Sequence, residues 1–253
     1  MGAEGAPGLR WFDCNARIGR WANPQPEQFT EIGDLLAAWD RAGIEGGLAH
    51  HTWAWEWSPA PGNAKLLEEI GGAPRIRPCF VALPPATREL EPPREFAALV
   101  RRLGGAVRIF PSMHNWRVSE WCAGALFAAL AEQGVPLLLD TSEVDAEGIA
   151  TILAAHAGMP VIALGFYYRW DRFFYPLLEK HADLYLESGT YGVFEGVEMV
   201  CARFGADRLV FGTGLPELEV GGPMALVTYA EIADEDKRKI AGDTMRRLLG
   251  EVA

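Results

Sequence analysis

Short apolar runs alternate along the chain with longer stretches in which apolar residues recur every three or four positions. The short runs are typical of buried strands, and the longer stretches are typical of helices that place one face on a sheet. Strands are predicted at residues 10–13, 46–50, 75–83, 106–110, 135–140, 160–164, 183–187 and 208–212. Helices are predicted at residues 27–41, 63–70, 94–103, 119–133, 145–156, 172–180, 194–204 and 231–250.

Eight strand–helix pairs in succession predict a single α/β domain, a closed (β/α)8 TIM barrel, rather than an open sheet. The run 135–140 is nearly all apolar, as expected for a parallel strand that is buried on both faces. The chain has 253 residues, and one such barrel takes about 250. No linker interrupts the repeat, so we expect one domain over residues 1–253. Functional side chains should then lie at the C-terminal ends of the strands.

Composition narrows the class of protein. The net charge of -11 disfavours nucleic acid or an anionic membrane as the main partner. No apolar run approaches the roughly 20 residues needed to cross a bilayer, and the first ten residues lack the pattern of a signal peptide. The four cysteines are scattered without CxxC spacing, which indicates reduced thiols and a cytoplasmic protein.

Five segments follow one another in a recognisable order and spacing: Gly104–Ile109, Gly134–Thr141, Met159–Gly165, Phe204–Pro216 and Asp243–Gly250. They resemble the ends of strands four, five, six and eight and the closing helix of the amidohydrolase-related, metal-dependent hydrolases. The segment that ends in Pro216 is the most specific match. The resemblance implies a TIM barrel that hydrolyses amides, lactones or related bonds, or that removes a carboxyl group.

The chain departs from this family at the metal ligands. The family usually has His-x-His at the end of the first strand, histidines at the ends of strands five and six, and an aspartate after strand eight. Here the corresponding residues are Asn15, Arg17, Asp140, Gly165 and Gly214. Zinc-type sites need several imidazole, thiolate or carboxylate donors, and a guanidinium cannot deprotonate to bind a cation. We therefore expect no metal and no other cofactor.

Polar residues expected at the barrel mouth form the candidate site. Arg17 and Arg108 can fork a carboxylate or phosphate, which predicts an anionic small-molecule ligand. Asp140 or Glu187 can act as general base and a histidine as acid. The catalytic candidates are Asp140, Arg17, His50 and Glu187. The candidates for substrate binding are Asn15, Arg108, His114, Trp53, Tyr167 and Glu217.

A simpler interpretation treats Arg17 as the occupant of the metal's place, paired with Asp140 in a buried ion pair without chemistry. We favour this pairing, and a second anion is then required for Arg108. Glu187 can supply that anion from within the chain, or a substrate carboxylate can supply it from outside.

Side-chain alternation also predicts directions at the strand ends. Residues two apart on a strand face the same way. Asp13, Asn15 and Arg17 should therefore point inward, and Cys14 should point outward as a buried, inert thiol. Of the adjacent histidines at the end of the second strand, at most one should face the site.

Eight aromatic residues gather in the loops expected at the same end: Trp53, Trp55, Trp57, Trp116, Phe166, Tyr167, Tyr168 and Trp170. Such rings can stack on a flat ligand or bury the interface of a homodimer. Packing of the loops over the barrel mouth accounts for several of them.

Three functions are compatible with these observations. The first is a metal-independent hydrolase or lyase for a small carboxylated or cyclic substrate. The second is a catalytically inactive pseudoenzyme that serves as a binding or assembly module. The third, which we rank last, is an enzyme whose metal site has moved to His50 or His51 with His114, Asp140 and Glu187.

Overall fold

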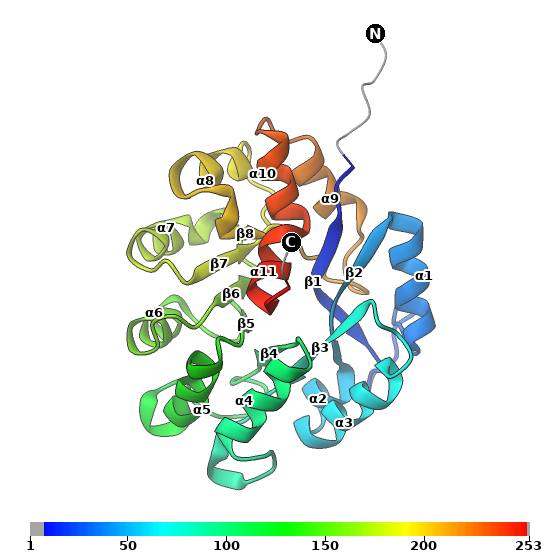
Figure 1. Ribbon diagram of the computed structural model, residues 1–253, viewed down its shortest axis with the longest axis vertical. Helices are drawn as coiled ribbons and strands as arrows, with labels where there is room; N and C mark the ends of the chain where they lie inside the picture. The colour runs from blue at the N-terminus through cyan, green and yellow to red at the C-terminus, as the bar shows by residue number, and fades with distance from the viewer. Residues whose placement is uncertain (1–7, 252–253) are drawn as a thin grey trace.

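Eight parallel strands form one sheet in chain order in the computed structural model, which describes residues 8–251 (Figure 1). Each strand pairs in parallel with the next. The strands are β1 (Trp11–Ile18), β2 (Ile44–His51), β3 (Ile76–Val81), β4 (Ala106–Ile109), β5 (Leu137–Asp140), β6 (Val161–Leu164), β7 (Leu184–Glu187) and β8 (Leu209–Val210).

The sheet closes on itself between β1 and the chain that follows β8. The Cys14 N–H donates to the Phe211 carbonyl at 2.9 Å, and the Arg17 N–H donates to the Leu215 carbonyl at 2.9 Å. Ala16 and Leu215 also form a parallel bridge. The predicted TIM barrel is confirmed.

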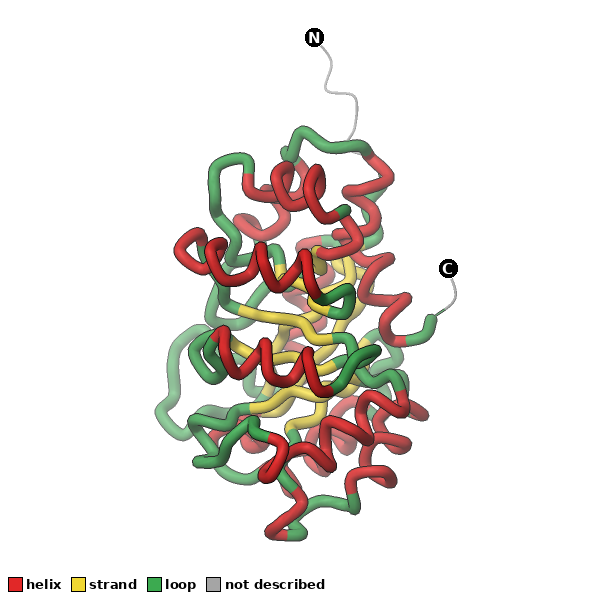
Figure 2. Tube along the Cα trace, turned by 90° about the vertical axis from the view of Figure 1, so that its left-hand side faces the viewer, coloured by secondary structure: helices red, strands yellow, loops and turns green. Residues whose placement is uncertain are grey.

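Helices surround the strands on the outside, except for α11, which lies across one end of the barrel (Figures 1 and 2). They are α1 (Ile32–Ala42), α2 (Thr52–Glu56), α3 (Pro59–Ile70), α4 (Pro93–Arg102), α5 (Glu120–Gln133), α6 (Ala146–Ala155), α7 (Asp171–Lys180), α8 (Gly196–Phe204), α9 (Gly221–Thr228), α10 (Asp234–Arg238) and α11 (Thr244–Leu249). Shorter turns of 3₁₀-helix are η1 (Pro85–Thr87), η2 (Tyr168–Trp170) and η3 (Ala206–Arg208), and η4 (Lys239–Asp243) is a π-helix. None of the helices described between residues 8 and 251 is both long and apolar enough to cross a membrane.

Two apolar layers result from side-chain alternation along the strands. Val107 and Leu137 belong to the outer layer, which packs against the helices. Leu138 and Ile162 belong to the inner layer, which fills the barrel. Helix α11 lies across the centre of the ring of strands in Figure 1 and adds Met245 to the inner layer. This end of the barrel is therefore closed by apolar packing, and the polar site lies at the other end.

Strand β1 contains a bulge beside β2. Asp13 is paired with Gly47 and Ala16 with Ala49, so β1 advances one residue more than β2 over this interval. A β-bulge of this kind inserts one extra residue and reverses the alternation of the side chains that follow.

The bulge changes which residues of β1 face the barrel interior. Asp13 points outward, where the Trp39 indole N–H of α1 donates to it at 3.1 Å. Cys14 joins the inner apolar layer, and both Asn15 and Arg17 line the cavity at the mouth. The predicted inward Asp13 and outward Cys14 are wrong, because simple alternation does not hold across a bulge. Cys14 is nevertheless buried, and burial raises the pKa of its thiol well above the usual value.

Candidate functional site

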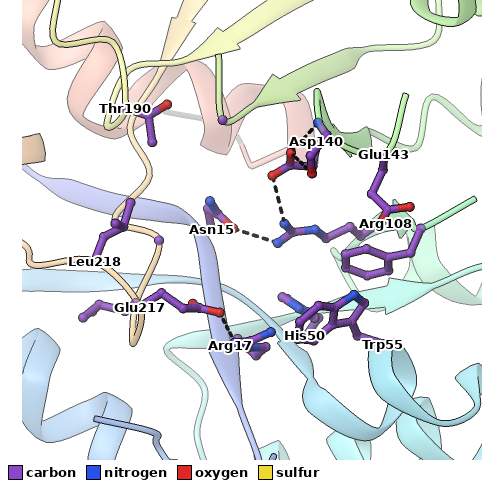
Figure 3. Close-up of a pocket in the computed structure, with 15 residues that line it drawn as sticks. Asn15, Arg17, His50, Trp55, Arg108, Asp140, Glu143, Thr190, Glu217 and Leu218 are labelled. Carbon is purple, nitrogen blue, oxygen red and sulfur yellow. Dashed lines mark hydrogen bonds and ion pairs between the residues drawn. The ribbon is translucent and has the colours of Figure 1, made fainter. Parts of the chain in front are cut away.

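A cavity of about 310 Å³ lies at the C-terminal mouth of the barrel (Figure 3). Six of the residues predicted for the site line it: Asn15, Arg17, His50, Arg108, Asp140 and Glu217. The other lining residues are Trp55, Phe110, Ser142, Glu143, Gly165, Thr190, Gly214, Leu215 and Leu218. The cavity thus brings together the ends of strands that are far apart in sequence.

Arg108 lies at the centre of the site in Figure 3. Its Nη1 donates to Asn15 Oδ1 at 2.7 Å, and its Nη2 is 4.0 Å from Asp140 Oδ2. The guanidinium also lies 5.0 Å from the centre of the Phe110 ring. Its Nε is buried without a hydrogen-bond partner in the described part of the chain. Arg108 is therefore held in position while part of its donor capacity is unused.

Arg17 is held between two indole rings. Its guanidinium carbon lies 4.2 Å from the centre of the Trp21 ring and 4.3 Å from that of Trp55. Burial lowers the pKa of Arg17 to about 9, and the neighbouring charge of Arg108 acts in the same direction. The anion that contacts Arg17 is the carboxylate of Glu217.

The predicted ion pair between Arg17 and Asp140 is therefore wrong. Asp140 ends β5, which lies beside β4, so its nearest guanidinium is that of Arg108. Arg17 lies on β1, beside the chain that follows β8 and carries Glu217. Each arginine thus pairs with a carboxylate from the segment beside its own strand: Arg108 with Asp140, and Arg17 with Glu217. The second anion of the site is therefore Glu217 and not Glu187.

Asp140 is held by the turn that follows β5. Its Oδ1 accepts hydrogen bonds from the Ser142 N–H at 2.8 Å and the Ser142 hydroxyl at 2.7 Å. Its Oδ2 faces Arg108, and 27% of the side chain is exposed. A Cβ at Gly165 would lie 3.0 Å from Oδ2. The glycine therefore leaves one carboxylate oxygen accessible to a small ligand.

Of the two adjacent histidines, only His50 faces the cavity. Its Nδ1 is 3.1 Å from the Ala16 carbonyl, and because a carbonyl only accepts, Nδ1 carries the proton. Burial and then the charges of Arg108 and Arg17 lower the pKa of His50 well below its usual value. The ring is therefore neutral, and its Nε2 is a hydrogen-bond acceptor. This favours an acceptor role over the acid expected from the sequence.

His51 faces away from the cavity. Its Nδ1 accepts from the Trp53 N–H at 3.1 Å, and its Nε2 lies 3.8 Å from Glu69 on α3. Burial lowers the pKa of His51 to about 4. His51 therefore links β2 to the helices outside the barrel.

Glu187 lies below the cavity and does not line it. The side chain is buried, and it accepts from the Gly189 N–H at 2.8 Å. Thr190, which does line the cavity, has its hydroxyl 3.4 Å from Glu187 Oε2. Burial raises the pKa of Glu187 to about 8, so the group is protonated near neutral pH. A protonated carboxyl does not act as the general base that the sequence predicted.

Three further candidates lie outside the cavity. His114 Nε2 is 2.8 Å from the Trp55 carbonyl, so this histidine positions the loop that carries Trp55. Trp53 is 38% exposed and packs edge-on against Trp57. Tyr167 is 46% exposed and packs against the next tyrosine.

Two aromatic residues, one lining the cavity and one beside it, were not among the predicted site residues. Phe110 follows Arg108 by two positions, so alternation along the strand was a signal that it faces the same way. Trp21, which covers one face of Arg17, comes from the loop after β1 and had no comparable signal. Glu143, a polar residue expected at the mouth, does line the cavity. It accepts from the backbone N–H groups of Ser112 and Met113 at 2.8 and 3.1 Å, so it joins two loops there.

The donor set does not fit a divalent metal. Across residues 8–251, no three His, Cys, Asp or Glu side chains are grouped so that they could hold an ion. The relocated site considered from the sequence does not form, because His51 and Glu187 point elsewhere and His114 binds the Trp55 carbonyl. Asp140 also faces the guanidinium of Arg108.

A parallel barrel with its polar cavity at the C-terminal mouth is the architecture of TIM-barrel enzymes. Residues 22–250 match the family described as Amidohydrolase, and the chain belongs to this family. No curated protein matches the chain by sequence.

Solved structures of similar fold cover nearly the whole chain. An uncharacterised TIM-barrel protein from Bordetella bronchiseptica has a TM-score of 0.74 at 17% identity, over 96% of this chain and 99% of its own. The 2,6-dihydroxybenzoate decarboxylase from Rhizobium has a TM-score of 0.69 at 15% identity, over 96% and 99%. The 5-carboxyvanillate decarboxylase from Novosphingobium aromaticivorans has a TM-score of 0.72 at 12% identity, over 97% and 99%. At these identities the likeness shows the shared fold.

Proposed function

We propose that this protein binds a small aromatic carboxylate in the cavity and acts on it as a lyase or hydrolase without a metal ion. The observation that carries the proposal is the pair of guanidinium groups at the mouth. Arg17 and Arg108 each have a buried Nε without a hydrogen-bond partner among residues 8–251. Buried donors of this kind are costly to leave unpaired, and a planar carboxylate matches a guanidinium fork.

The walls of the cavity suit an aromatic ring. Trp55 and Phe110 supply aromatic surface, and Leu218 supplies aliphatic surface. The volume of about 310 Å³ lies at the lower end of the range of small-molecule sites, about 300–1,000 Å³. A single substituted ring with a carboxylate is therefore the size of ligand that the site favours.

Two relatives of the same fold support this ligand class. One structure is 2,6-dihydroxybenzoate decarboxylase complexed with 2,6-dihydroxybenzoate. Another is the 5-carboxyvanillate decarboxylase with bound manganese and 3-methoxy-4-hydroxy-5-nitrobenzoic acid. In the present chain, two guanidinium groups replace the positive charge that a metal would bring. The resemblance places metal ligands at five positions, which in this chain hold Asn15, Arg17, Asp140, Gly165 and Gly214. Asp140 is the only carboxylate among them, and none is an imidazole or a thiolate. One carboxylate does not hold a catalytic ion.

The geometry suggests roles for the lining residues. Arg108 and Arg17 bind the carboxylate, and neutral His50 accepts a hydrogen bond from a ring hydroxyl. In a decarboxylation the C–C bond to the carboxylate breaks, CO₂ leaves, and the ring carbon takes up a proton. Asp140, a carboxylate beside Arg108, is placed to pass a proton from water to the ring carbon, or to activate water as a base in a hydrolysis.

The alternative is a pseudoenzyme that binds the same ligand without turnover. Asp140 already accepts two hydrogen bonds from Ser142, and Glu187 is buried below the site. Both carboxyls are thus engaged with the protein, which favours binding without catalysis.

Calorimetric titration with benzoate and with benzamide tests the binding proposal. We expect benzoate to bind and the uncharged, nearly isosteric benzamide to bind at least about tenfold more weakly, because a charge-assisted hydrogen bond contributes about 1.5–3 kcal/mol. Arg108→Gln should abolish this preference, whereas Arg94→Gln on the exposed surface of α4 should keep it. Equal affinity for the two compounds would contradict the proposal.

Turnover separates the enzyme from the pseudoenzyme. Carboxylated phenols such as 2,6-dihydroxybenzoate are incubated with the protein in the presence of a chelator, and loss of the carboxylate is followed by NMR. Decarboxylation that persists with chelator supports the metal-independent lyase. Binding without any change in the compounds supports the pseudoenzyme.

We also propose a homodimer formed through the aromatic loops in a cytoplasmic protein. Trp57 is 70% exposed beside Trp53, and exposed tryptophans are enriched at interfaces. The four cysteines are unpaired, as in a reducing compartment. Light scattering should give the mass of two chains for the native protein and of one chain for the Trp53→Ala, Trp57→Ala variant. A native protein with the mass of one chain would overturn the dimer.

A further inference from the structure

Glu217 occupies the part of Arg17 that a ligand carboxylate needs. The indole rings of Trp21 and Trp55 cover the two faces of the guanidinium, and only 6% of the Arg17 side chain is exposed. Hydrogen-bond donors of a guanidinium lie in its plane, so an anion reaches Arg17 only at an edge. Glu217 contacts Nη2, and the Nε on the same edge of the guanidinium is buried and unpartnered within residues 8–251.

The two members of this ion pair differ in how firmly they are held. Arg17 lies on β1 between two rings, in the closed sheet. Glu217 comes from the segment 211–220, which joins β8 to α9 without a helix or strand of its own. Backbone hydrogen bonds attach this segment to β1 at Gly214 and Leu215. Beyond them the Glu217 side chain is 43% exposed, and in the described structure its only hydrogen bond is to Arg17.

We propose that Glu217 is a built-in competitor that decides which ligands enter the site. Its carboxylate takes the place of the ligand's carboxylate on Arg17, and a ligand binds by displacing it toward solvent. The exchange replaces one ion pair by another, so Arg17 is never left buried without an anion. A ligand that lacks a carboxylate forms no ion pair with Arg17, so it does not displace Glu217. This inference rests on the proposed binding of a carboxylate.

The adjoining residues fit this movement. Leu218, the next residue, lines the cavity and is 45% exposed. It packs over Gly214, where a Cβ would come within 2.8 Å of the Leu218 side chain. Displacement of Glu217 therefore also moves an apolar side chain at the cavity mouth.

Benzoate affinity of matched variants tests the competition. Glu217→Gln keeps the shape of the side chain and removes its charge, and we expect benzoate to bind about tenfold more tightly, as when a competitor that fills the site nine-tenths of the time is removed. Glu219→Gln removes the same charge from an exposed position of the same segment and should leave the affinity unchanged. Calorimetry gives the affinities, and the change in total tryptophan fluorescence, to which Trp21 and Trp55 at the site contribute, gives an independent reading.

The outcomes separate this inference from the function on which it rests. Tighter binding by Glu217→Gln alone supports the competitor. If the wild type binds benzoate and Glu217→Gln binds it equally or more weakly, the competitor is overturned and the binding proposal stands. An equal gain in Glu219→Gln would assign the effect to net charge and overturn the competitor. If folded wild type and Glu217→Gln both fail to bind, the two proposals fall together.

Discussion

Glu187 carries a pH-dependent contribution to stability. Burial raises its pKa from 4.5 to about 8 in the folded chain, so between these values the folded state holds a proton that the unfolded state has lost. A raised carboxyl pKa stabilises the fold below the unfolded pKa, and this contribution disappears as the pH rises through the folded pKa.

We therefore expect the free energy of unfolding to fall between about pH 4.5 and pH 8, with at most about 1.4 kcal/mol per pH unit from this one group. Glu187→Gln, which cannot ionise, should lose that slope and gain stability relative to the wild type as the pH rises. Urea denaturation at several pH values gives both curves. Asp13, whose pKa burial also raises, is present in both proteins, and its charge is one of the causes that raise the pKa of Glu187. Parallel curves would show that Glu187 does not titrate in this range.

Asp140 is the residue on which turnover should depend. In Asp140→Asn we expect the rate with any substrate found to fall by roughly 10²–10⁴, as for loss of a general acid or base. Benzoate affinity should be kept or increased, because a negative charge beside Arg108 is removed. Glu143→Gln is the matched control, since it removes a carboxylate from the same cavity. A similar loss of rate in both variants would point to electrostatics rather than proton transfer.

The sequence largely predicted the residues that line the mouth of the barrel. It did not predict which of these residues form ion pairs with each other. Arg108 and Asp140 follow apolar runs, and parallel strands bring such ends to one rim. The partner of Arg17 depends on which chain lies beside β1, and that is settled by the closure of the barrel at Leu215. Ion pairs between strand ends therefore depend on the three-dimensional arrangement of the strands and cannot be predicted from the sequence pattern alone.

At the level of elements, apolar spacing predicted the order of strands and helices but not where the backbone departs from regular geometry. The helix expected over 231–250 is interrupted by the π-helix Lys239–Asp243. In that turn the Ile240 carbonyl accepts from the Phe211 N–H at 3.0 Å, a bond to the end of β8. Helix α9 begins with Gly-Gly-Pro, which has poor helix propensity. The π-helix is thus tied to the barrel by a tertiary hydrogen bond that apolar spacing does not show.

The bulge in β1 depends on a close approach to β2. A Cβ at Gly47 would collide with the Asp13 backbone carbonyl. Gly47→Ala should lower the free energy of unfolding by about 1–3 kcal/mol, the usual cost of overpacking a core, and should weaken benzoate binding because Arg17 shifts with β1. Gly33→Ala in α1, where an added Cβ meets nothing within 4 Å, is the control and should be neutral or slightly stabilising. Equal stabilities of the two variants in urea would contradict this account.

On the scale of the whole molecule, the barrel shares its fold with a decarboxylase solved with bound manganese, yet its mouth has the wrong donors for such an ion. We expect protein purified without chelator to carry far less than one transition-metal ion per chain. Elemental analysis measures this, with the 5-carboxyvanillate decarboxylase from Novosphingobium aromaticivorans purified in parallel as the positive control. About one zinc, manganese or iron per chain would contradict the interpretation of Arg17 and Arg108.

The indole rings on either side of Arg17 fix a positive charge that is part of the polypeptide itself. Such a charge needs no loading step, so it is in place as soon as the barrel has folded. It also does not exchange with other cations or change oxidation state. Under the proposed metal-independent function, the number of working sites would depend on synthesis of the chain and not on the supply of metal ions in the cell.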